Sequence, residues 1–174
     1  MTETPDRIVV ARHRDLAGRR AGILWRRAAL TALTLFLVAG LVNVFGQRPG
    51  RTTVDAPAAS LELYAPSHLR GGLLYEARFT IHANRTLKRA VLVLSPGWNE
   101  GTQVNTIEPS PVSETSSDGR HAFALGRIRA GSTYRLFMEF QVNPTNVGRR
   151  DADVWLYDGD TRVLSIDRDV TVFP

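Results

Sequence analysis

The feature that most constrains this chain is an uncharged apolar stretch near its start. Residues 28–46 contain no charged side chain and only three polar ones, Thr31, Thr34 and Asn43. As a helix rising about 1.5 Å per residue, the stretch would measure about 28 Å, close to the ~30 Å hydrocarbon core of a bilayer. We therefore predict a transmembrane helix over residues 28–46.

Two other interpretations of this stretch compete with an anchor. A cleaved signal peptide has a shorter apolar region, roughly 7–15 residues, followed by two small residues around a cleavage site. The local candidate for such a site, Val44-Phe45-Gly46, fits this pattern poorly, and Ala56-Pro57-Ala58 lies far downstream. A buried core helix is the third interpretation. The length of the stretch favours an uncleaved anchor over both.

The charge is concentrated before the apolar stretch. Residues 1–27 hold seven arginines and three acidic residues, so +4 of the chain's net charge of +5 lies there and only +1 on the rest. A nucleic-acid-binding domain carries its basic surface on the folded part, so nucleic acid is not expected as a partner. An arginine-rich flank stays in the cytoplasm. We expect a basic cytoplasmic tail over 1–27 and an extracytoplasmic C-terminal domain, in a single-pass protein of the plasma membrane.

The domain must fold without disulfides, because the chain has no cysteine. Many exported proteins use disulfides, so a cysteine-free chain argues against a disulfide-stapled secreted module and suits a bacterial envelope protein. The composition also suggests a bacterial source. Lys88 is the single lysine among 22 basic residues, and such a preference for arginine is typical of GC-rich bacterial genomes.

After the apolar stretch, the pattern changes to the alternation typical of strands. Residues 47–59 mix Pro, Gly and Thr without apolar periodicity, which predicts a linker. Residues 75–83 and 133–142 alternate apolar and polar side chains, and this indicates two half-buried strands. Residues 109–119, "PSPVSETSSDG", are interpreted as a surface loop.

Further strands are predicted with a weaker pattern at 60–65, 88–95, 103–108, 121–128, 151–157 and 161–173. Asp158-Gly159 separates the last two, and Asp-Gly between apolar runs is a strong hairpin signal. Seven or eight short strands without a second helical segment predict an all-β fold. We expect an immunoglobulin-like antiparallel β-sandwich over residues 60–174.

A family resemblance supports this fold. The run "FALGRIRAGSTYRLFMEFQVNP" contains a short apolar strand ending in Leu125-Gly126, a turn with Gly131 and the long alternating strand 133–142. This order resembles the late strand pair of bacterial immunoglobulin-like adhesion-type (CARDB-like) repeats, over about residues 73–142. The resemblance implies a spacer or binding module and brings no catalytic residues with it. A single copy on an anchor departs from the tandem arrays usual in that family.

Candidate metal ligands are few. His82 and His121 would meet only if their two strands paired, and two imidazoles alone make an incomplete metal site. Three Asp-x-Asp pairs, at 151/153, 158/160 and 167/169, supply the oxygen ligands that calcium prefers. Turn chemistry and nearby arginines explain these carboxylates equally well. We therefore predict no metal site and no cofactor, and keep a calcium- or ligand-binding envelope module as the alternative function.

No catalytic motif is present. The sequence lacks Gly-x-Ser-x-Gly, Ser-x-x-Lys, a Walker loop and His-Glu-x-x-His. A hydrolase whose triad is dispersed along the chain is the third possibility. We expect a protein that is not an enzyme.

Three residues are the candidates for partner contacts. Trp98 and Asn99 lie in the loop "SPGWNEG", where Pro96-Gly97 sets a turn at a sandwich end. Trp98 either faces a partner there or folds back over the core, and the second arrangement is the commoner one. Phe137 falls on the polar face of its strand. The expected function is a membrane-anchored, extracytoplasmic protein-interaction module, an accessory subunit of an envelope complex, whose partners are the bilayer and an unknown membrane or envelope protein.

Overall fold

The computed structural model describes residues 20–42, 44 and 47–174. Most of the predicted basic tail, together with Asn43, Phe45 and Gly46 of the predicted span, lies outside the described residues. The chain divides into two compact units, residues 1–45 and 46–174, and each is described by itself. In chain order the elements are α1 (Arg20–Leu41), β1 (Pro49–Asp55), β2 (Ala59–Pro66), β3 (His68–Arg70), β4 (Leu74–Ala83), β5 (Leu87–Leu94), the 3₁₀ helix η2 (Pro96–Trp98), β6 (Thr102–Glu108), β7 (Ser113–Ser117), β8 (Arg120–Ile128), β9 (Thr133–Val142), β10 (Gly148–Asp151), β11 (Val154–Asp158), β12 (Thr161–Ile166) and β13 (Asp169–Phe173).

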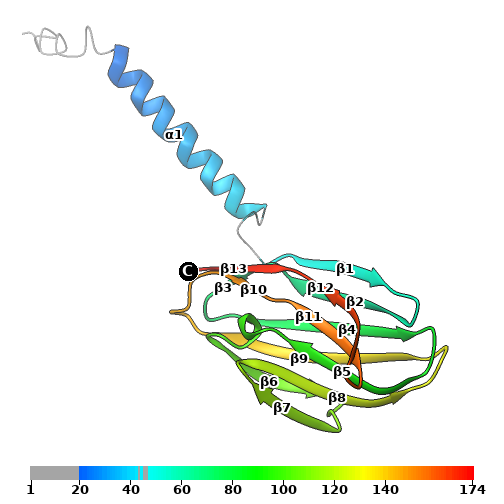
Figure 1. The fold of residues 1–174 in the computed structure, drawn as a ribbon. Coiled ribbons are helices and arrows are strands. Elements are labelled where there is room, and N and C mark those ends of the chain that lie inside the picture. The colour runs from blue at the N-terminus through cyan, green and yellow to red at the C-terminus, as the bar shows by residue number, and fades with distance from the viewer. Residues whose placement is uncertain (1–19, 43, 45–46) are drawn as a thin grey trace, which may run out of the picture. The chain divides into compact units, whose positions relative to one another are not determined.

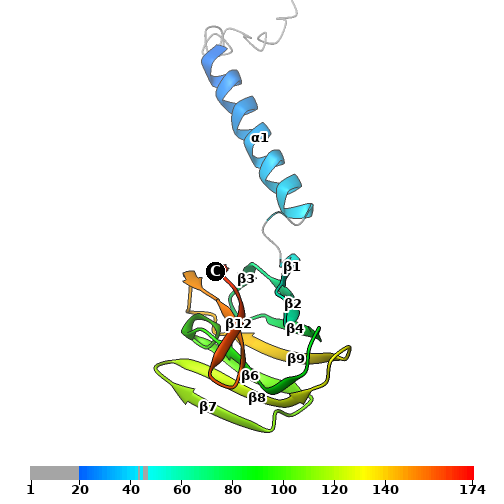
Figure 2. The same ribbon diagram turned by 45° about the vertical axis from the view of Figure 1, so that its right-hand side comes forward.

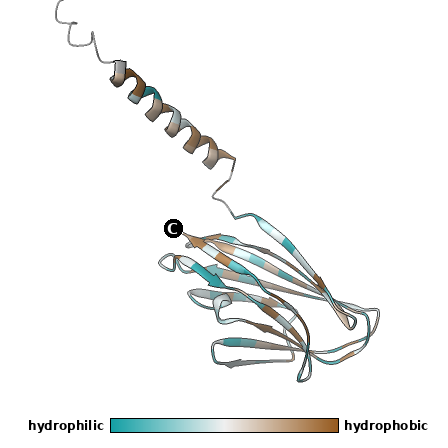
Figure 3. Ribbon diagram, turned by 45° about the horizontal axis from the view of Figure 1, so that its top comes forward, coloured by the Kyte–Doolittle hydropathy of each residue, from teal (hydrophilic) through white to brown (hydrophobic). Residues whose placement is uncertain are grey.

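The first unit contains one apolar helix, α1, of 22 residues. It begins eight residues before the predicted span and so includes Arg26 and Arg27. Its apolar side chains are exposed within the unit, and Figure 3 shows it as mostly hydrophobic. The hydroxyl of Thr34 donates to the carbonyl oxygen of Leu30 (2.8 Å), which satisfies this polar group within the helix. The segment Ala21–Leu41 is long and apolar enough to cross a membrane, a property that anchors and signal sequences share.

The second unit is an antiparallel β-sandwich (Figures 1 and 2). Sheet 1 has the strand order β1-β2-β4-β9-β6 and sheet 2 the order β12-β11-β5-β8-β7. A small sheet, β10-β13-β3, contains the parallel pair β13 and β3. The predicted all-β sandwich preceded by one apolar helix is confirmed. The described residues form more strands than the seven or eight expected, because several short polar strands add to the apolar ones.

One core lies between the two large sheets. Each strand contributes alternate side chains to it, as the period of two requires. The two strands predicted with most support behave as expected: Phe79 and Ile81 of β4 face inward, as do Leu136 and Phe140 of β9. From sheet 2 the core receives Leu92, Leu94, Phe123, Val154, Leu156 and Ile166, among others.

Seven residues of the predicted linker, 47–59, form a strand. Residues 49–55 form β1, which pairs with β2 at seven consecutive positions, from Pro49 opposite Pro66 to Asp55 opposite Ser60. Its backbone therefore belongs to sheet 1 although its side chains are mostly exposed. The sequence hides this strand because only Val54 among its residues is a large apolar side chain, so no alternation is visible.

The predicted surface loop over 109–119 also contains a strand. Residues 113–117 form β7, which pairs with β8 from Ser113 opposite Ala124 to Ser117 opposite Arg120. The two strands are joined by Asp118 and Gly119, both with positive φ (52° and 73°), as a tight two-residue hairpin turn requires. Asp118-Gly119 is the same hairpin signal as Asp158-Gly159, but the five polar residues before it concealed the strand.

The last predicted strand, 161–173, is two strands in two different sheets. β12 pairs with β11 in sheet 2, whereas β13 pairs with β10 and β3 in the small sheet. The chain changes sheet at Asp167 and Arg168. The backbone N–H of Arg168 donates to the carboxylate of Asp153 (3.0 Å), and its carbonyl accepts the N–H of Ala152 (2.7 Å). These two bonds hold the crossing.

Candidate functional site

Trp98 lies inside the sandwich and is only 2% exposed. Its ring centroid is 5.6 Å from that of Phe79 and 5.5 Å from that of Phe140, and its Nε1–H donates to the carbonyl of Asp153 (3.1 Å). The guanidinium of Arg168 lies 5.4 Å above the ring. The indole thus covers the end of the core, the commoner of the two arrangements considered, and offers no surface to a partner.

Gly97 explains how the loop brings Trp98 inward. A Cβ at residue 97 would lie 1.8 Å from the carbonyl oxygen of Asp151, so only glycine lets η2 approach β10 this closely. Asn99 follows η2 and is half-buried, and its Nδ2 has no hydrogen-bond partner among the described residues.

Phe137, the third candidate, lies on the outer face of sheet 1. The guanidinium of Arg78, opposite it on β4, lies 5.0 Å from its ring and 5.6 Å from the ring of Tyr64. The three side chains form a cross-strand stack. Phe137 is therefore half-covered by side chains of its own sheet, on the outer face, whereas Trp98 lies in the core.

The two histidines do not meet. His82 lies on β4 in sheet 1, where its ring is hydrogen-bonded to the hydroxyl of Thr133 (3.1 Å), and His121 lies on β8 in sheet 2. The pairing that would have joined them is replaced by β4 with β9 and β8 with β5. In the described part of the chain, no group of three or more histidines and carboxylates is placed to hold a metal ion.

Each of the three aspartate pairs has at least one member engaged within the fold. Asp158 accepts the backbone N–H of Arg89 (2.8 Å), and Asp160 lies 3.5 Å from the guanidinium of the same arginine. Asp169 forms an ion pair with Arg149 across β10 and β13. The hydrogen bond from Arg149 holds the pKa of Asp169 below its usual value. These carboxylates stabilise turns and strand pairs.

Trp155 is an aromatic residue on the outer face of sheet 2 and is half-buried. It lies on β11 between the buried residues Val154 and Leu156, so the alternation of the strand turns it to the outer face of sheet 2. Tyr157 projects from the same face two residues later. Between them and β7 the sheet carries small side chains, Val93 and Ala122, which are paired opposite each other and opposite Trp155 and Thr115.

Two adjoining depressions meet at this tryptophan, and we call them together the Trp155 groove. The larger, a cleft of ≈ 580 Å³, lies between the loop after β5 and strand β10. The smaller, of ≈ 270 Å³, lies on the face of sheet 2, with Trp155 and Tyr157 on one side and Thr115 and Ser117 on the other. Both depressions are lined by Asp118, Arg120 and Trp155.

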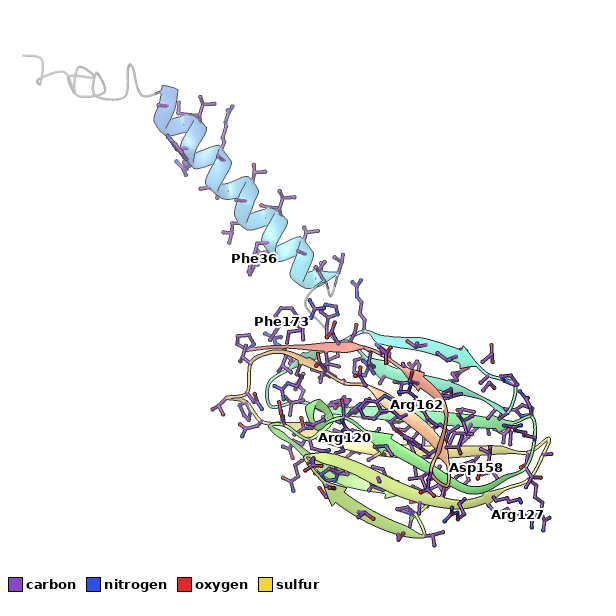
Figure 4. All side chains as sticks on the ribbon, in the orientation of Figure 1. Phe36, Arg120, Arg127, Asp158, Arg162 and Phe173 are labelled. Atoms are coloured by element: carbon purple, nitrogen blue, oxygen red, sulfur yellow. The ribbon has the colours of Figure 1, made fainter. Side chains whose placement is uncertain are left out.

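Arg120 occupies the junction of the two depressions. It comes from the start of β8 (Figure 4), and its guanidinium lies 5.2 Å from the ring of Trp155. It is exposed and forms no ion pair with any of the described residues. Its neighbours are bound: Arg150 donates to the carbonyl of Asn146 (3.2 Å) and to that of Glu100. Of the three arginines that line the groove, Arg149 is paired with Asp169 and Arg150 is hydrogen-bonded, so Arg120 is the one whose guanidinium a ligand can engage without displacing either contact.

The side chains behind the cleft are buried or hydrogen-bonded, and some are apolar. Arg168 lies over the buried ring of Trp98 and donates to the carbonyl of Pro66 (2.7 Å). Burial lowers the pKa of Arg168, and burial raises the pKa of Tyr75 in the same region. Ser95, also buried, donates to the carbonyl of Asp151 (3.1 Å) and accepts the N–H of Asp153 (2.8 Å). The surface residues of the groove therefore lie over buried side chains that are themselves hydrogen-bonded.

The loop predicted from the sequence also borders the Trp155 groove, but the aromatic side chain that lines the groove is Trp155 and not Trp98. The loop "SPGWNEG" does line the cleft, through Ser95, Pro96, Gly97 and Glu100. Trp155 is not among the residues singled out from the sequence. Its place in "DVWLY", between the apolar Val154 and Leu156, already implies an outward side chain, because neighbouring residues of a strand point to opposite faces. Arg120 carried no signal in the sequence, because its contact with Trp155 depends on the pairing of β5 with both β8 and β11.

No family model and no curated protein matches the chain. Among solved structures it is similar to the chitin-binding domain of a hyperthermophilic chitinase from Pyrococcus furiosus, at 18% identity and a TM-score of 0.41, over 66% of this chain and 100% of that chain. It is also similar to the GAE domain of GGA2p from Saccharomyces cerevisiae, at 16% identity and a TM-score of 0.33, over 72% and 98%. At these scores the likenesses carry no argument about function.

Proposed function

We propose that this protein is a single-pass, membrane-anchored binding module of the bacterial envelope, with its N-terminus in the cytoplasm and its β-sandwich outside. The length and composition of α1 support an anchor. The seven arginines among residues 1–27 support this orientation, because basic flanks are retained in the cytoplasm. We further propose that the sandwich serves as the CARDB-like repeats do, as a binding module.

The ligand of the module is proposed to be another membrane or envelope protein, which docks at the Trp155 groove. The observation that carries this is the composition of the groove: Trp155, Tyr157 and Arg120 lie together on one exposed face. Tryptophan, tyrosine and arginine are the residues that most often dominate binding energy at protein interfaces. The mixed charges around them, Asp118 and Glu100 beside Arg120, would orient the partner rather than attract any polyanion.

The anchor contributes to this function by restricting the domain to the membrane surface. A tethered domain meets a partner in the same membrane at an effective concentration far above its bulk value. A groove of modest size can then hold a partner that it would release in solution. An accessory subunit of an envelope complex is the role that fits this arrangement.

The test compares aromatic residues on the two outer faces. Full-length protein is purified in detergent with its partners from cells producing wild type, Trp155→Ala or Phe137→Ala. We expect a stoichiometric protein with wild type and with Phe137→Ala, and its loss by about tenfold or more with Trp155→Ala, as for an interface hot spot. Equal recovery with Trp155→Ala, or loss with Phe137→Ala alone, would move the docking surface away from the groove.

A further inference from the structure

The strand edges of the sandwich differ in how they are protected. An exposed edge presents unpaired backbone groups to any other strand, and proteins protect edges by bulges, charges, proline or a covering segment. The edges β1 and β12 lie on the same side and contact each other. The edge β6 carries a register shift between Val104 and Thr106, which interrupts its regularity. Three of the four outer edges of the large sheets are therefore covered or interrupted.

β7 is the exception. Its five residues pair with β8 without a register shift, and it is the last strand of sheet 2, at the outer margin of the domain in Figures 1 and 2. All five residues are exposed; they include no proline and no basic residue, and Glu114 is the one charged side chain among them. Next to it, Val112 is 77% exposed, the most exposed large apolar side chain of the domain. Within the described chain nothing covers this edge.

The sequence of β7, Ser-Glu-Thr-Ser-Ser, is complementary to itself in one orientation. If a second copy pairs antiparallel about Thr115, Ser113 lies opposite the other copy's Ser117 and Glu114 lies opposite Ser116. Thr115 then faces its own counterpart. Hydroxyl residues directly opposite one another stabilise a strand pair, and like charges directly opposite destabilise it. A parallel pairing in register would instead place the two Glu114 side chains side by side.

We infer that β7 is a dimerisation edge, through which two copies of this chain join their sheets antiparallel about Thr115 into one continuous sheet. The arrangement is the two-fold, self-complementary interface usual in homodimers. With the register continued by one residue, Val112 lies opposite the other copy's Asp118, so the exposed valine is covered by the partner's hairpin turn. Thr115 and Ser117 also line the Trp155 groove, so the second copy extends the wall of each groove.

Five paired residues make a small interface, below the ~1,600 Å² of a standard stable one. The inference therefore rests on the proposed membrane anchoring, which raises the local concentration of the copies. For this reason the test uses the full chain in membranes.

The absence of cysteine makes a cross-linking test specific, because every disulfide must come from an introduced residue. Directly opposite residues in an antiparallel pair are about 4.5–5.5 Å apart, within the reach of a disulfide. Membranes containing full-length Thr115→Cys are treated with a mild oxidant and analysed on a non-reducing gel. We expect a disulfide dimer with Thr115→Cys, and also when Ser113→Cys and Ser117→Cys carrying different tags are co-expressed.

The control for register is Ser113→Cys alone. Its two copies would lie four residues apart along the strands, roughly 13 Å, and should form little dimer. A second control tests the edge: Thr115→Glu places two like charges opposite each other and should lower the Ser113→Cys with Ser117→Cys product several-fold. A glutamate introduced instead on β6, an edge strand of sheet 1, by Gln103→Glu should leave the amount of that disulfide product unchanged.

The outcomes separate the two proposals. Protein absent from the membrane fraction would contradict the anchor. Protein in the membrane that forms no dimer with Thr115→Cys, or that forms it equally with Ser113→Cys alone, would overturn the dimerisation edge and leave the anchor standing. Melting curves of each variant establish that its domain is folded.

Discussion

The two tryptophans of the domain show how one side chain can serve the core and another the surface. Trp98 is buried against Phe79 and Phe140 and hydrogen-bonded to the carbonyl of Asp153. Trp155 is half-buried on the outer face of sheet 2, where its exposed side meets Arg120. Substitutions at the two positions should therefore affect different properties.

At the residue scale, Trp98→Ala should destabilise the domain by about 3–5 kcal/mol, the usual cost of removing a buried aromatic side chain. It also leaves the Asp153 carbonyl without its indole donor and Arg168 without the ring beneath it. Urea unfolding of the wild type and the variant measures the loss. Trp155→Ala is the matched control and should cost much less, since part of its ring is already in water. Equal losses would contradict the division of roles.

Individual residues also show what could be predicted from the sequence. The inward positions of β4 and β9 were predictable because their side chains alternate, with Phe137 as the exception on the outer face of β9. The sequence favours burial of Trp98, but the contact that allows it, Gly97 against Asp151, joins segments far apart in the chain and has no sequence pattern. The groove itself was beyond prediction, because it joins residues of several strands through their pairing.

At the element scale, β1 shows that a strand can pair through its backbone without an alternating apolar pattern in its side chains. Its place in sheet 1 comes from seven consecutive pairs with β2, and its own side chains bury little. β7 is similar. Polar edge strands of this kind escape sequence patterns, which detect the apolar face of a strand and not its backbone bonds.

The contribution of β1 can be measured by truncation. A domain beginning at residue 46 retains β1, and one beginning at residue 57 lacks it and exposes the edge of β2. We expect the shorter domain to melt at a temperature lower by roughly 5 °C or more, since a lost strand pairing of this length should cost more than 1 kcal/mol. Equal melting temperatures would show that the segment acts as the linker that the sequence suggested.

The pairing of β10 with β13 should depend on pH. The hydrogen bond from Arg149 lowers the pKa of Asp169 in the folded state, so this pair adds stability above the usual aspartate pKa of about 3.9. That stability is lost as the pH falls through the lowered value. The unfolding free energy of the wild type should therefore exceed that of Arg149→Gln at pH 7, and the difference should shrink as the pH falls through the lowered pKa of Asp169.

The effect at this pair should be small, because both side chains are exposed to solvent. The control is Arg127→Gln, which removes an exposed arginine that has no ion pair among the described residues. It should show no comparable change with pH. A difference for Arg149→Gln that persists unchanged at low pH would exclude the ion pair as its cause.

At the scale of the whole molecule, the proposals depend on which side of the membrane each unit occupies. The charge distribution predicts a cytoplasmic N-terminus, and a helix like α1 is compatible with either an anchor or a cleaved signal. Single cysteines in this cysteine-free chain can report the side directly. Arg127→Cys lies at an exposed position of the sandwich, and Thr2→Cys lies in the basic tail.

In intact cells, after the outer layers of the envelope are made permeable, a membrane-impermeant maleimide should label Arg127→Cys and leave Thr2→Cys unlabelled until the membrane is lysed. The labelled protein should retain the mass of the full chain, because an uncleaved anchor keeps its tail. Labelling in the reverse order would place the Trp155 groove in the cytoplasm and require a cytoplasmic partner. A labelled product lacking the tail would make the sandwich a released domain. Its effective concentration would then no longer be raised by attachment to the membrane, and neither docking at the groove nor pairing at β7 would have that support.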